Sequence, residues 1–324
     1  MRNRKFIYAA LDLLTLGFAA LALVACDKNN DDLGIDVMKD TPITVTAGVE
    51  GMLTRTGYDT ENLPMSFYLT IDQEGSNYDY SKVLMTKNAG TATYSAPEGT
   101  MLLWKDGNHE AAAVNAYTTV GTTFTVQTDQ SNTANVLASD LLGAGKTDVV
   151  TSDITINGNN IAVDFRHLLC KLDVTYSWSS ELMVETITDK SIKSVKYVGF
   201  GSDVSLNRAT ASVESNDATA EIAALVTGMT SEAIFAPYVG ETPKIVITIE
   251  TTTGEDEAAV TAERMFSINV KAPTNGFVSG NRDTMNGTIG GKAAETGEIS
   301  IAEGWETGDA NGDADGTTGN MATN

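Results

Sequence analysis

The sequence predicts an all-β protein built from antiparallel β-sandwiches, and three observations support this. Short apolar or β-branched runs recur between clusters of Gly, Asn and Asp, which is typical of strands joined by turns. No helix-length amphipathic segment separates these runs, which disfavours alternating strand–helix units. The length of 324 residues suits two domains of ordinary size rather than one.

The composition is strongly acidic, with a net charge of −22 and only two Cys and two His. A nucleic-acid partner is therefore not expected, because phosphate contacts need clustered Lys and Arg. The negative charge instead keeps a surface protein soluble and self-repelling.

The first 25 residues are organised as an export signal. Arg2, Arg4 and Lys5 form a basic start, and a nearly continuous apolar run follows up to residue 24. The run ends in Leu-Val-Ala-Cys, which resembles the lipobox of bacterial lipoproteins, where the Cys thiol is acylated with diacylglycerol. We therefore expect a lipoprotein signal peptide over residues 1–25 and an outer-membrane lipid anchor at Cys26. The alternative is a transmembrane anchor, for which the run has about the minimum length.

A polar, acidic stretch follows Cys26, so residues 26–40 are predicted to form a flexible tether. Once Cys26 is acylated, Cys170 is the only other thiol, and no internal disulfide can form. Cys170 lies in an apolar run, and we expect it to be a small buried residue.

Residues 41–58 are predicted to form a first strand followed by a loop. Apolar side chains alternate here with Thr and Gly, and this period of two indicates a half-buried strand. The alternating apolar residues are Ile43, Val45, Ala47 and Val49. Glycines lie on both sides of a lone Arg55, so the segment suits an exposed, cleavable loop.

The remaining strand-like runs fall into two halves. In the first half they are residues 65–71, 101–104, 111–117, 122–126, 155–156, 161–169 and 172–178, with a short helix or loop at 134–142. In the second half they are residues 195–200, 209–213, 234–238, 244–251, 265–270, 284–289 and 299–302. A polar stretch at 179–191 separates the halves and predicts domains of residues 41–180 and 181–305. The low-complexity acidic residues 306–324 are predicted to be disordered.

An ordered set of landmarks covers nearly the whole chain. The landmarks are Cys26, the run ITVTAGVEGMLTRTGY, MSFYLTI, Trp104 before Ala111–Tyr117, SDLLGA at 139–144, Phe165-x-His167-x-x-x-Lys171-Leu172 and Ile299–Trp305. With these landmarks in this order, the chain resembles the fimbrillins, subunits of the type V pili of Bacteroidales.

The resemblance implies two transthyretin-like antiparallel β-sandwich domains in tandem and export as a lipoprotein. It also implies that a trypsin-like, Arg-specific protease removes the lipidated N-terminal strand, residues 41–55, by cutting the Arg55–Thr56 bond. Ile43, Val45, Ala47 and Val49 would be the core-facing side chains of that strand. A strand from another fimbrial subunit then fills the groove by donor-strand exchange. The alternative is that Arg55 is an ordinary turn residue in a subunit that is never cut.

The C-terminus departs from this family pattern. Residues 306–324 offer no alternating apolar strand to donate to a neighbour. Either Glu298–Trp305 moves out to donate, or the subunit accepts a strand without donating one, which would suit a tip or accessory position.

Several patterns evoke chemistry, but no catalytic site, metal site or cofactor is expected. The run Gly143–Thr147 evokes a phosphate loop, but Asp140 stands where that loop needs Gly, so a turn is predicted. Asp309–Gly316 evokes a calcium loop that lacks its final Glu. His109 and His167 fit no metal-ligand spacing, and His167 is expected to be structural.

Asp283-Thr284-Met285 resembles a short O-glycosylation signal of Bacteroidota surface proteins, which makes Thr284 a candidate glycosylation site.

The favoured function is a structural pilus subunit with a role in adhesion, located at the outer membrane and cell surface. The alternative is a monomeric, surface-anchored glycan- or host-binding lipoprotein. An enzyme is not expected, since the sequence contains no nucleophile elbow or metal-ligand motif.

Overall fold

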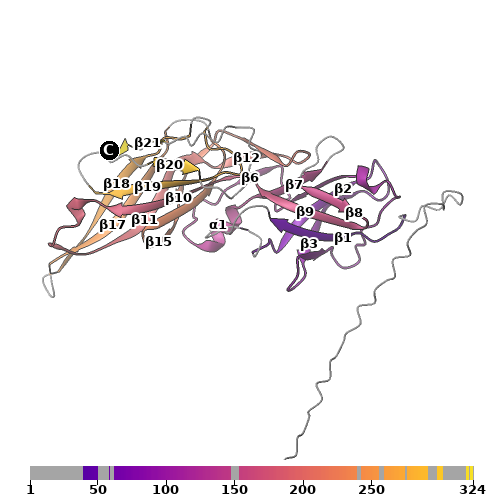
Figure 1. Ribbon diagram of the computed structural model, residues 1–324, viewed down its shortest axis with the longest axis horizontal. Coiled ribbons are helices and arrows are strands. Elements are labelled where there is room, and N and C mark those ends of the chain that lie inside the picture. The colour runs from indigo at the N-terminus through magenta and orange to yellow at the C-terminus, as the bar shows by residue number, and fades with distance from the viewer. Residues whose placement is uncertain are drawn as a thin grey trace, which may run out of the picture. The chain divides into compact units, whose positions relative to one another are not determined.

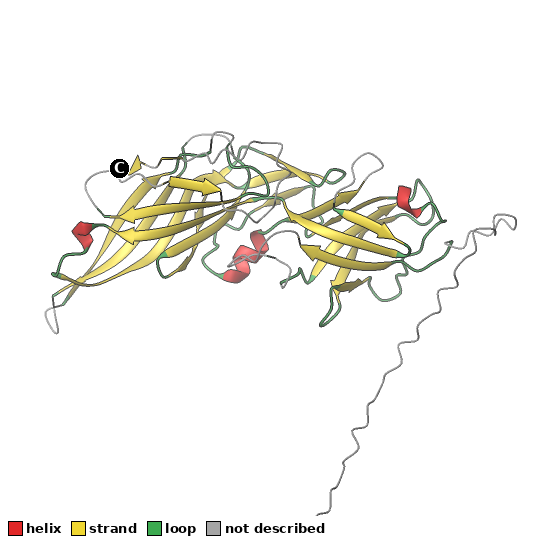
Figure 2. Ribbon diagram, in the orientation of Figure 1, coloured by secondary structure: helices red, strands yellow, loops and turns green. Residues whose placement is uncertain are grey.

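The computed structural model describes residues 39–49, 58, 62–146, 153–238, 242–254, 259–273, 276–290, 298–301, 319–320 and 322–323. All the described residues belong to one compact unit, Val37–Asn324. This unit is all-β, with only short helices among its strands (Figures 1 and 2). The helices are η1 (His109–Ala111), α1 (Thr133–Ser139) and η2 (Ser180–Leu182).

The first sheet contains eight strands in the order β1-β4-β3-β2-β5-β7-β9-β8, and β1 also pairs with β9. β1 therefore closes a ring that would otherwise be open between β4 and β9. The strands are β1 (Thr44–Val49), β2 (Ser66–Asp72), β3 (Tyr80–Lys87), β4 (Thr93–Ser95), β5 (Ala113–Tyr117), β7 (Leu142–Lys146), β8 (Ile154–Asn157) and β9 (Asn160–His167).

Three further sheets follow. The six-stranded sheet has the order β15 (Leu225–Thr227), β16 (Thr230–Phe235), β10 (Cys170–Trp178), β19 (Arg282–Ile289), β20 (Glu298–Ile301) and β21 (Gly319–Asn320). The five-stranded sheet has the order β14 (Thr219–Ala223), β11 (Ile187–Gly201), β17 (Lys244–Thr253), β18 (Val260–Asn269) and β22 (Ala322–Thr323). The small sheet has the order β13 (Ser212–Ser215), β12 (Asp203–Asn207) and β6 (Thr123–Thr125).

The buried apolar side chains form two separate clusters. The first is centred on Phe67, which packs edge-on against Phe165 with 5.1 Å between ring centroids. The second is centred on Phe235, whose ring lies 4.8 Å from Phe200 and 4.9 Å from Phe277. Edge-to-face aromatic pairs of this kind add stability beyond their buried area. The two clusters are therefore separate cores, and the second also takes in Tyr117 of β5.

The structure corrects several of the expected elements. Residues 172–178 were expected to close the first half, but β10 pairs with β16 and β19 in the six-stranded sheet. The polar stretch 179–191 was expected to lack a strand, yet β11 begins at Ile187. Gly143–Lys146 was expected to be a turn and is instead part of β7. A Cβ at Gly143 would lie 2.5 Å from the Leu168 side chain, so glycine is needed there for packing.

Two pairings depart from the expected antiparallel pattern. β1 runs parallel to β9, and β10 runs parallel to β19. In each pair the two strands are more than 100 residues apart in sequence, so no hairpin connects them. The short helix predicted within 134–142 is present as α1, and Cys170 is a free, buried thiol as expected.

Asp283 of β19 is a carboxyl group buried in the second half without a hydrogen-bond partner among the described residues. Its side chain is 1% exposed, and both oxygens lack a donor. Desolvation by this burial raises the pKa of Asp283 to about 7. Burial, and then the charge of Asp283, raise the pKa of the Cys170 thiol.

We expect Asp283 to make the protein less stable as the pH rises from about 4 to about 7. Within this window the folded carboxyl stays protonated, whereas the unfolded one ionises at about 3.9. The unfolded state then binds fewer protons, so the free energy of unfolding falls by at most on the order of 4 kcal/mol. Thermal melts measured across this pH range should show a much smaller loss of stability for Asp283→Asn than for the unsubstituted protein. An equal fall in both proteins would assign the effect to other groups.

Candidate functional site: the first strand and its groove

β1 is held in the first core by its alternate side chains. Val45, Ala47 and Val49 are 2%, 6% and 2% exposed, and Ile43 packs against the same cluster. The alternation in the sequence correctly predicted a half-buried strand with these residues facing inward. Burying each valine contributes roughly 1.5–3 kcal/mol relative to leaving it exposed.

β1 lies between two strands that come from different parts of the chain. On one edge it runs parallel to β9, in register from Thr44 with Asn160 to Val49 with Phe165. On the other edge it runs antiparallel to β4 over only two residue pairs. Figure 1 shows β1, in indigo, alongside β9. The parallel edge therefore supplies most of the pairing that holds the strand.

The residues just before β1 are also held by main-chain hydrogen bonds. The amides of Asp40 and Ile43 donate to the carbonyls of Trp104 and Leu102, each at 2.9 Å. The amide of Trp104 donates in return to the carbonyl of Thr41 at 3.0 Å. Asp40, the last residue of the predicted tether, is thus paired with the body of the protein. Residues 26–38 of that tether lie outside the described residues.

Polar side chains fix the register of β1 on its outer face. Thr44 Oγ1 donates to Asn160 Oδ1 at 3.1 Å, and Asn160 Nδ2 donates to Thr46 Oγ1 at 3.2 Å. Asn159 Nδ2 donates to the carbonyl of Pro42 at 3.2 Å. A slip of one residue would break all three bonds and would turn the apolar face outward.

Gly48 marks a close approach between β1 and β9. Its register partner is Asp164, and a Cβ on Gly48 would lie 3.0 Å from Asp164 Oδ1. A larger residue at this position would have to displace that carboxylate. Asp164 is exposed, so its carboxylate can turn aside, and the close approach does not by itself require glycine at this position.

The chain is anchored again at Tyr58. Its amide donates to Asp140 Oδ2 at 2.9 Å, while Asp140 Oδ1 lies 2.8 Å from His167 Nδ1. Asp140 and His167 are 3% and 2% exposed, so the carboxylate is enclosed by its two partners. Burial, and then the charge of Asp140, raise the pKa of the Tyr58 hydroxyl. Residues 50–57, which include Arg55, therefore connect two anchored points.

His167 is a structural histidine, as predicted, but its partner was not predicted. Asp140 lies 27 residues before His167, and neither spacing nor residue pattern signals the pair. Asn160, which ties down β1, was missed for the same reason. The other histidine, His109, lies 5.1 Å from the Trp104 ring between centroids.

Three of the predicted site residues lie outside the described residues. These are Cys26, Arg55 and Thr56, so their lipidation and cleavage stay predictions. Thr284 lies within β19, paired with both β10 and β20, and its neighbours Asp283 and Met285 are buried. Its glycosylation also stays a prediction.

The described residues contain no group of three or more His, Cys, Asp or Glu side chains that could hold a metal ion. The calcium-like pattern at 309–316 lies outside them. Within the same residues, no helix has the length and apolarity needed to cross a membrane.

We expect β1 to stabilise the precursor through its inward face. Val45→Ala should lower the free energy of unfolding by about 2 kcal/mol, because a fully buried side chain is truncated. Thr44→Ala, at the exposed neighbouring position, should cost less than about 1 kcal/mol. Urea denaturation of the two variants measures the difference. Equal costs would mean that the apolar face does not hold the strand in place.

Comparison with known proteins finds one family and several solved structures that are similar to this chain. The sequence profile of the fimbrillin-like family matches residues 43–305. No curated protein matches the sequence. A candidate cell adhesion protein from Bacteroides uniformis has a solved structure that is 18% identical, with a TM-score of 0.52, covering 82% of this chain and 98% of that one. One from Bacteroides ovatus is 13% identical, with a TM-score of 0.51, covering 82% and 97%.

The tip fimbrial protein Mfa3 from Porphyromonas gingivalis is 9% identical, with a TM-score of 0.45, and the match covers 81% of this chain and 100% of that one. At identities this low, structural likeness bears on the fold alone. The family profile is the stronger finding, because it runs from just before β1 to just after β20. The protein therefore belongs to the fimbrillin-like family.

Proposed function

We propose that this chain is a structural subunit of a cell-surface fimbria, made as a lipoprotein precursor and assembled by donor-strand exchange. Membership of the fimbrillin-like family supports the subunit role, the location in a surface appendage and assembly with other fimbrial subunits. The observation that carries the finer proposal is the position of β1. It is a core strand joined to the rest of the fold by the Arg55-containing residues 50–57.

The proposed maturation begins at the lipid-anchored Cys26 in the outer membrane. A trypsin-like, Arg-specific protease cuts the Arg55–Thr56 bond, after which only non-covalent contacts hold β1. The buried Asp140 keeps Tyr58, and thus the new N-terminal end, on the body of the protein. The cut therefore separates the strand from the fold without loosening the chain that follows.

Departure of β1 leaves a groove whose shape specifies its next occupant. The edge of β9 would present unpaired main-chain groups, and such an edge aggregates unless another strand covers it. The incoming strand has to run parallel to β9 and antiparallel to β4, as β1 does. It would carry small apolar residues at the Val45, Ala47 and Val49 positions. Main-chain hydrogen bonds then supply affinity and the pockets supply specificity.

We also propose that the two halves are transthyretin-like domains in tandem. The two separate apolar clusters support this division. The pairing of β10 with β16 and β19 favours a boundary near residues 168–169 rather than at 180.

The position of the subunit in the fimbria depends on whether it donates a strand. Glu298–Ile301 forms β20, which pairs with β19 at Asp283–Met285. In one version β20 leaves this sheet and inserts into a neighbour. In the other, β20 stays and the subunit only accepts a strand, which suits a tip or accessory position.

The cleavage step makes the first prediction of this proposal. N-terminal sequencing of the protein shed from the cell surface should begin at Thr56. Arg55→Lys should block processing by an Arg-specific protease while keeping the charge of the loop. Shed protein that begins at Cys26 throughout would contradict the proposal, as would normal processing of an Arg55→Ala variant.

The exchange step makes a second prediction. Protein cut at Arg55 should lose residues 41–55 and bind a synthetic peptide of that sequence. A peptide with Val45→Asp should bind less tightly, because it would place a charge among the buried apolar side chains of the first cluster. Equal binding of the two peptides would contradict the predicted register. Mixing cut protein with itself then distinguishes a subunit that donates β20 from one that only accepts a strand, since long polymers require a donated strand.

A further inference from the structure

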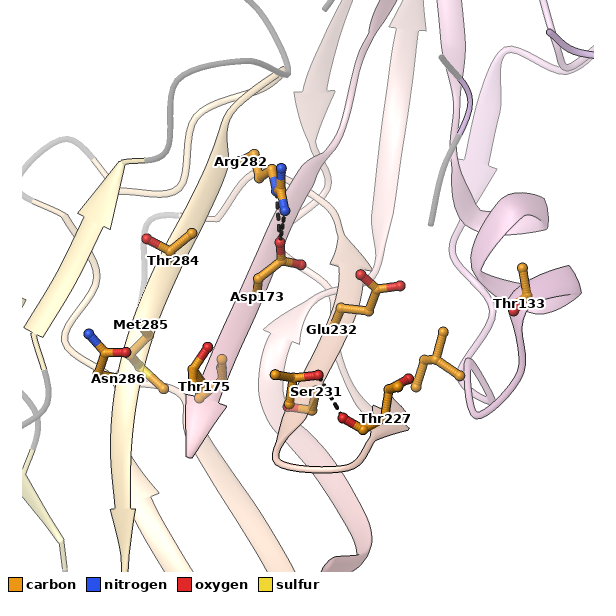
Figure 3. Close-up of a pocket in the computed structure, with 13 residues that line it drawn as sticks. Thr133, Asp173, Thr175, Thr227, Ser231, Glu232, Arg282, Thr284, Met285 and Asn286 are labelled. Atoms are coloured by element: carbon orange, nitrogen blue, oxygen red, sulfur yellow. Dashed lines mark hydrogen bonds and ion pairs between the residues drawn. The ribbon is translucent and has the colours of Figure 1, made fainter. Parts of the chain in front are cut away.

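A polar pocket of about 420 Å³ lies on the six-stranded sheet, away from β1 and its groove. Strands β10, β16 and β19 form its floor, and β15 and Thr133 of α1 flank it (Figure 3). Along β10, Leu172 and Val174 are buried in the second core, while Asp173 and Thr175 point the other way into the pocket. The pocket therefore uses the face of the sheet that is not packed in the core.

Strand register arranges the pocket residues in two rows. Asp173 is opposite Glu232 on β16 and Thr284 on β19. Thr175, one step further along, is opposite Thr230 on β16 and Asn286 on β19. One row thus offers two carboxylates and a hydroxyl, and the other offers two hydroxyls and an amide.

The charges beside the pocket cancel. Asp173 and Glu232 lie on neighbouring strands, where like charges repel. Lys171 Nζ lies 2.9 Å from Glu232 Oε2 and 3.8 Å from Asp173 Oδ1, and the Arg282 guanidinium pairs with Asp173 Oδ2. The Lys171 side chain is fully buried, which is tolerable only while its carboxylate partners stay charged. Two cations and two anions thus leave this group neutral.

Two acceptors in this neutral group lack a donor. Glu232 is 6% exposed, and its Oε1 accepts no hydrogen bond from the described residues. The same holds for Asp173 Oδ1. These oxygens are closed to solvent, so a ligand in the pocket would reach the hydroxyls and the amide of the second row instead.

The wall of the pocket near α1 is held firmly. Gln130, just before the helix, donates from Nε2 to the carbonyl of Ile234 at 2.7 Å. The amide of Ile234 donates back to Gln130 Oε1 at 2.8 Å. This two-way bond ties the start of α1 to β16, so the pocket is pre-formed, as ligand sites usually are.

We propose that this pocket binds a neutral saccharide. The cancelled charges favour a neutral ligand over a cation or an anion, and Thr175, Thr230 and Asn286 line the pocket with groups that donate and accept hydrogen bonds. The threonine hydroxyls both donate and accept, as sugar hydroxyls do. None of the described residues that line the pocket is aromatic, so binding rests on hydrogen bonds and is weak. The volume lies within the range of small-molecule sites. This proposal does not depend on strand exchange.

Saturation-transfer NMR on the purified protein tests the proposal. The probes are glucose, galactose, mannose, fucose and N-acetylglucosamine, with sialic acid and trilysine as charged comparisons. At least one neutral sugar should receive saturation. Thr175→Trp, at an exposed position on the pocket floor, should weaken its binding at least about tenfold. Thr219→Trp, at an exposed position of β14 in the other large sheet, should leave binding unchanged.

Asn286→Trp fills the same pocket from β19 and should have the same effect, which covers the case in which Thr175→Trp fails to fold. The proposal is overturned if none of the neutral sugars binds. It is also overturned if neither filling variant weakens binding, or if only sialic acid or trilysine binds.

Discussion

The parallel pairing of β1 with β9 is the interaction on which the first half of this protein depends. Without it the first sheet is an open array from β4 to β8, and one side of the core loses Val45, Ala47 and Val49. Because β1 is the first strand in sequence and its partner lies more than 100 residues later, no hairpin fixes this contact. Among the described residues, main-chain bonds, the apolar side chains of the strand and the polar contacts of Asn159 and Asn160 hold it in place.

This arrangement makes a closing strand that can be separated from the rest of the fold. A strand inside a hairpin leaves its partner only if the turn also opens. β1 is instead followed by residues 50–57, and the chain is held again at Tyr58 by Asp140. A cut between these two anchors would change what holds β1 and would leave the Asp140–His167 pair unchanged. The position of the strand is therefore compatible with the proposed assembly by strand exchange.

The six-stranded sheet carries a group of charged side chains that are largely buried. Lys171 is fully buried, and the carboxylates of Glu232 and Asp173 lie 2.9 and 3.8 Å from its ammonium group, with Arg282 balancing the second carboxylate. These four groups come from three strands, so the neutral cluster exists only when β16, β10 and β19 pair in register. The same register lines up the hydroxyls and amide of the polar pocket. Asp283, on the other face of β19, has no such compensation, and burial alone sets its pKa.

Local sequence patterns determined much of this protein. The alternation at Ile43–Val49 specified a strand and its inward face, because side-chain direction in a strand follows from a period of two. The turn residues between short β-branched runs specified an all-β fold. The same reasoning failed for Gly143–Lys146, where glycines serve close packing rather than a turn, and for β11, whose start is polar because it is exposed.

The contacts between residues that lie far apart in the sequence were decided by the tertiary structure. No local pattern shows that β1 runs parallel to β9, that β10 belongs with β19, or that Asp140 meets His167. Strand pairing over such separations depends on how whole sheets bury their apolar faces, and that is a property of the packed chain. The sequence by itself therefore determined the closing strand, and the tertiary structure determined the groove that it closes.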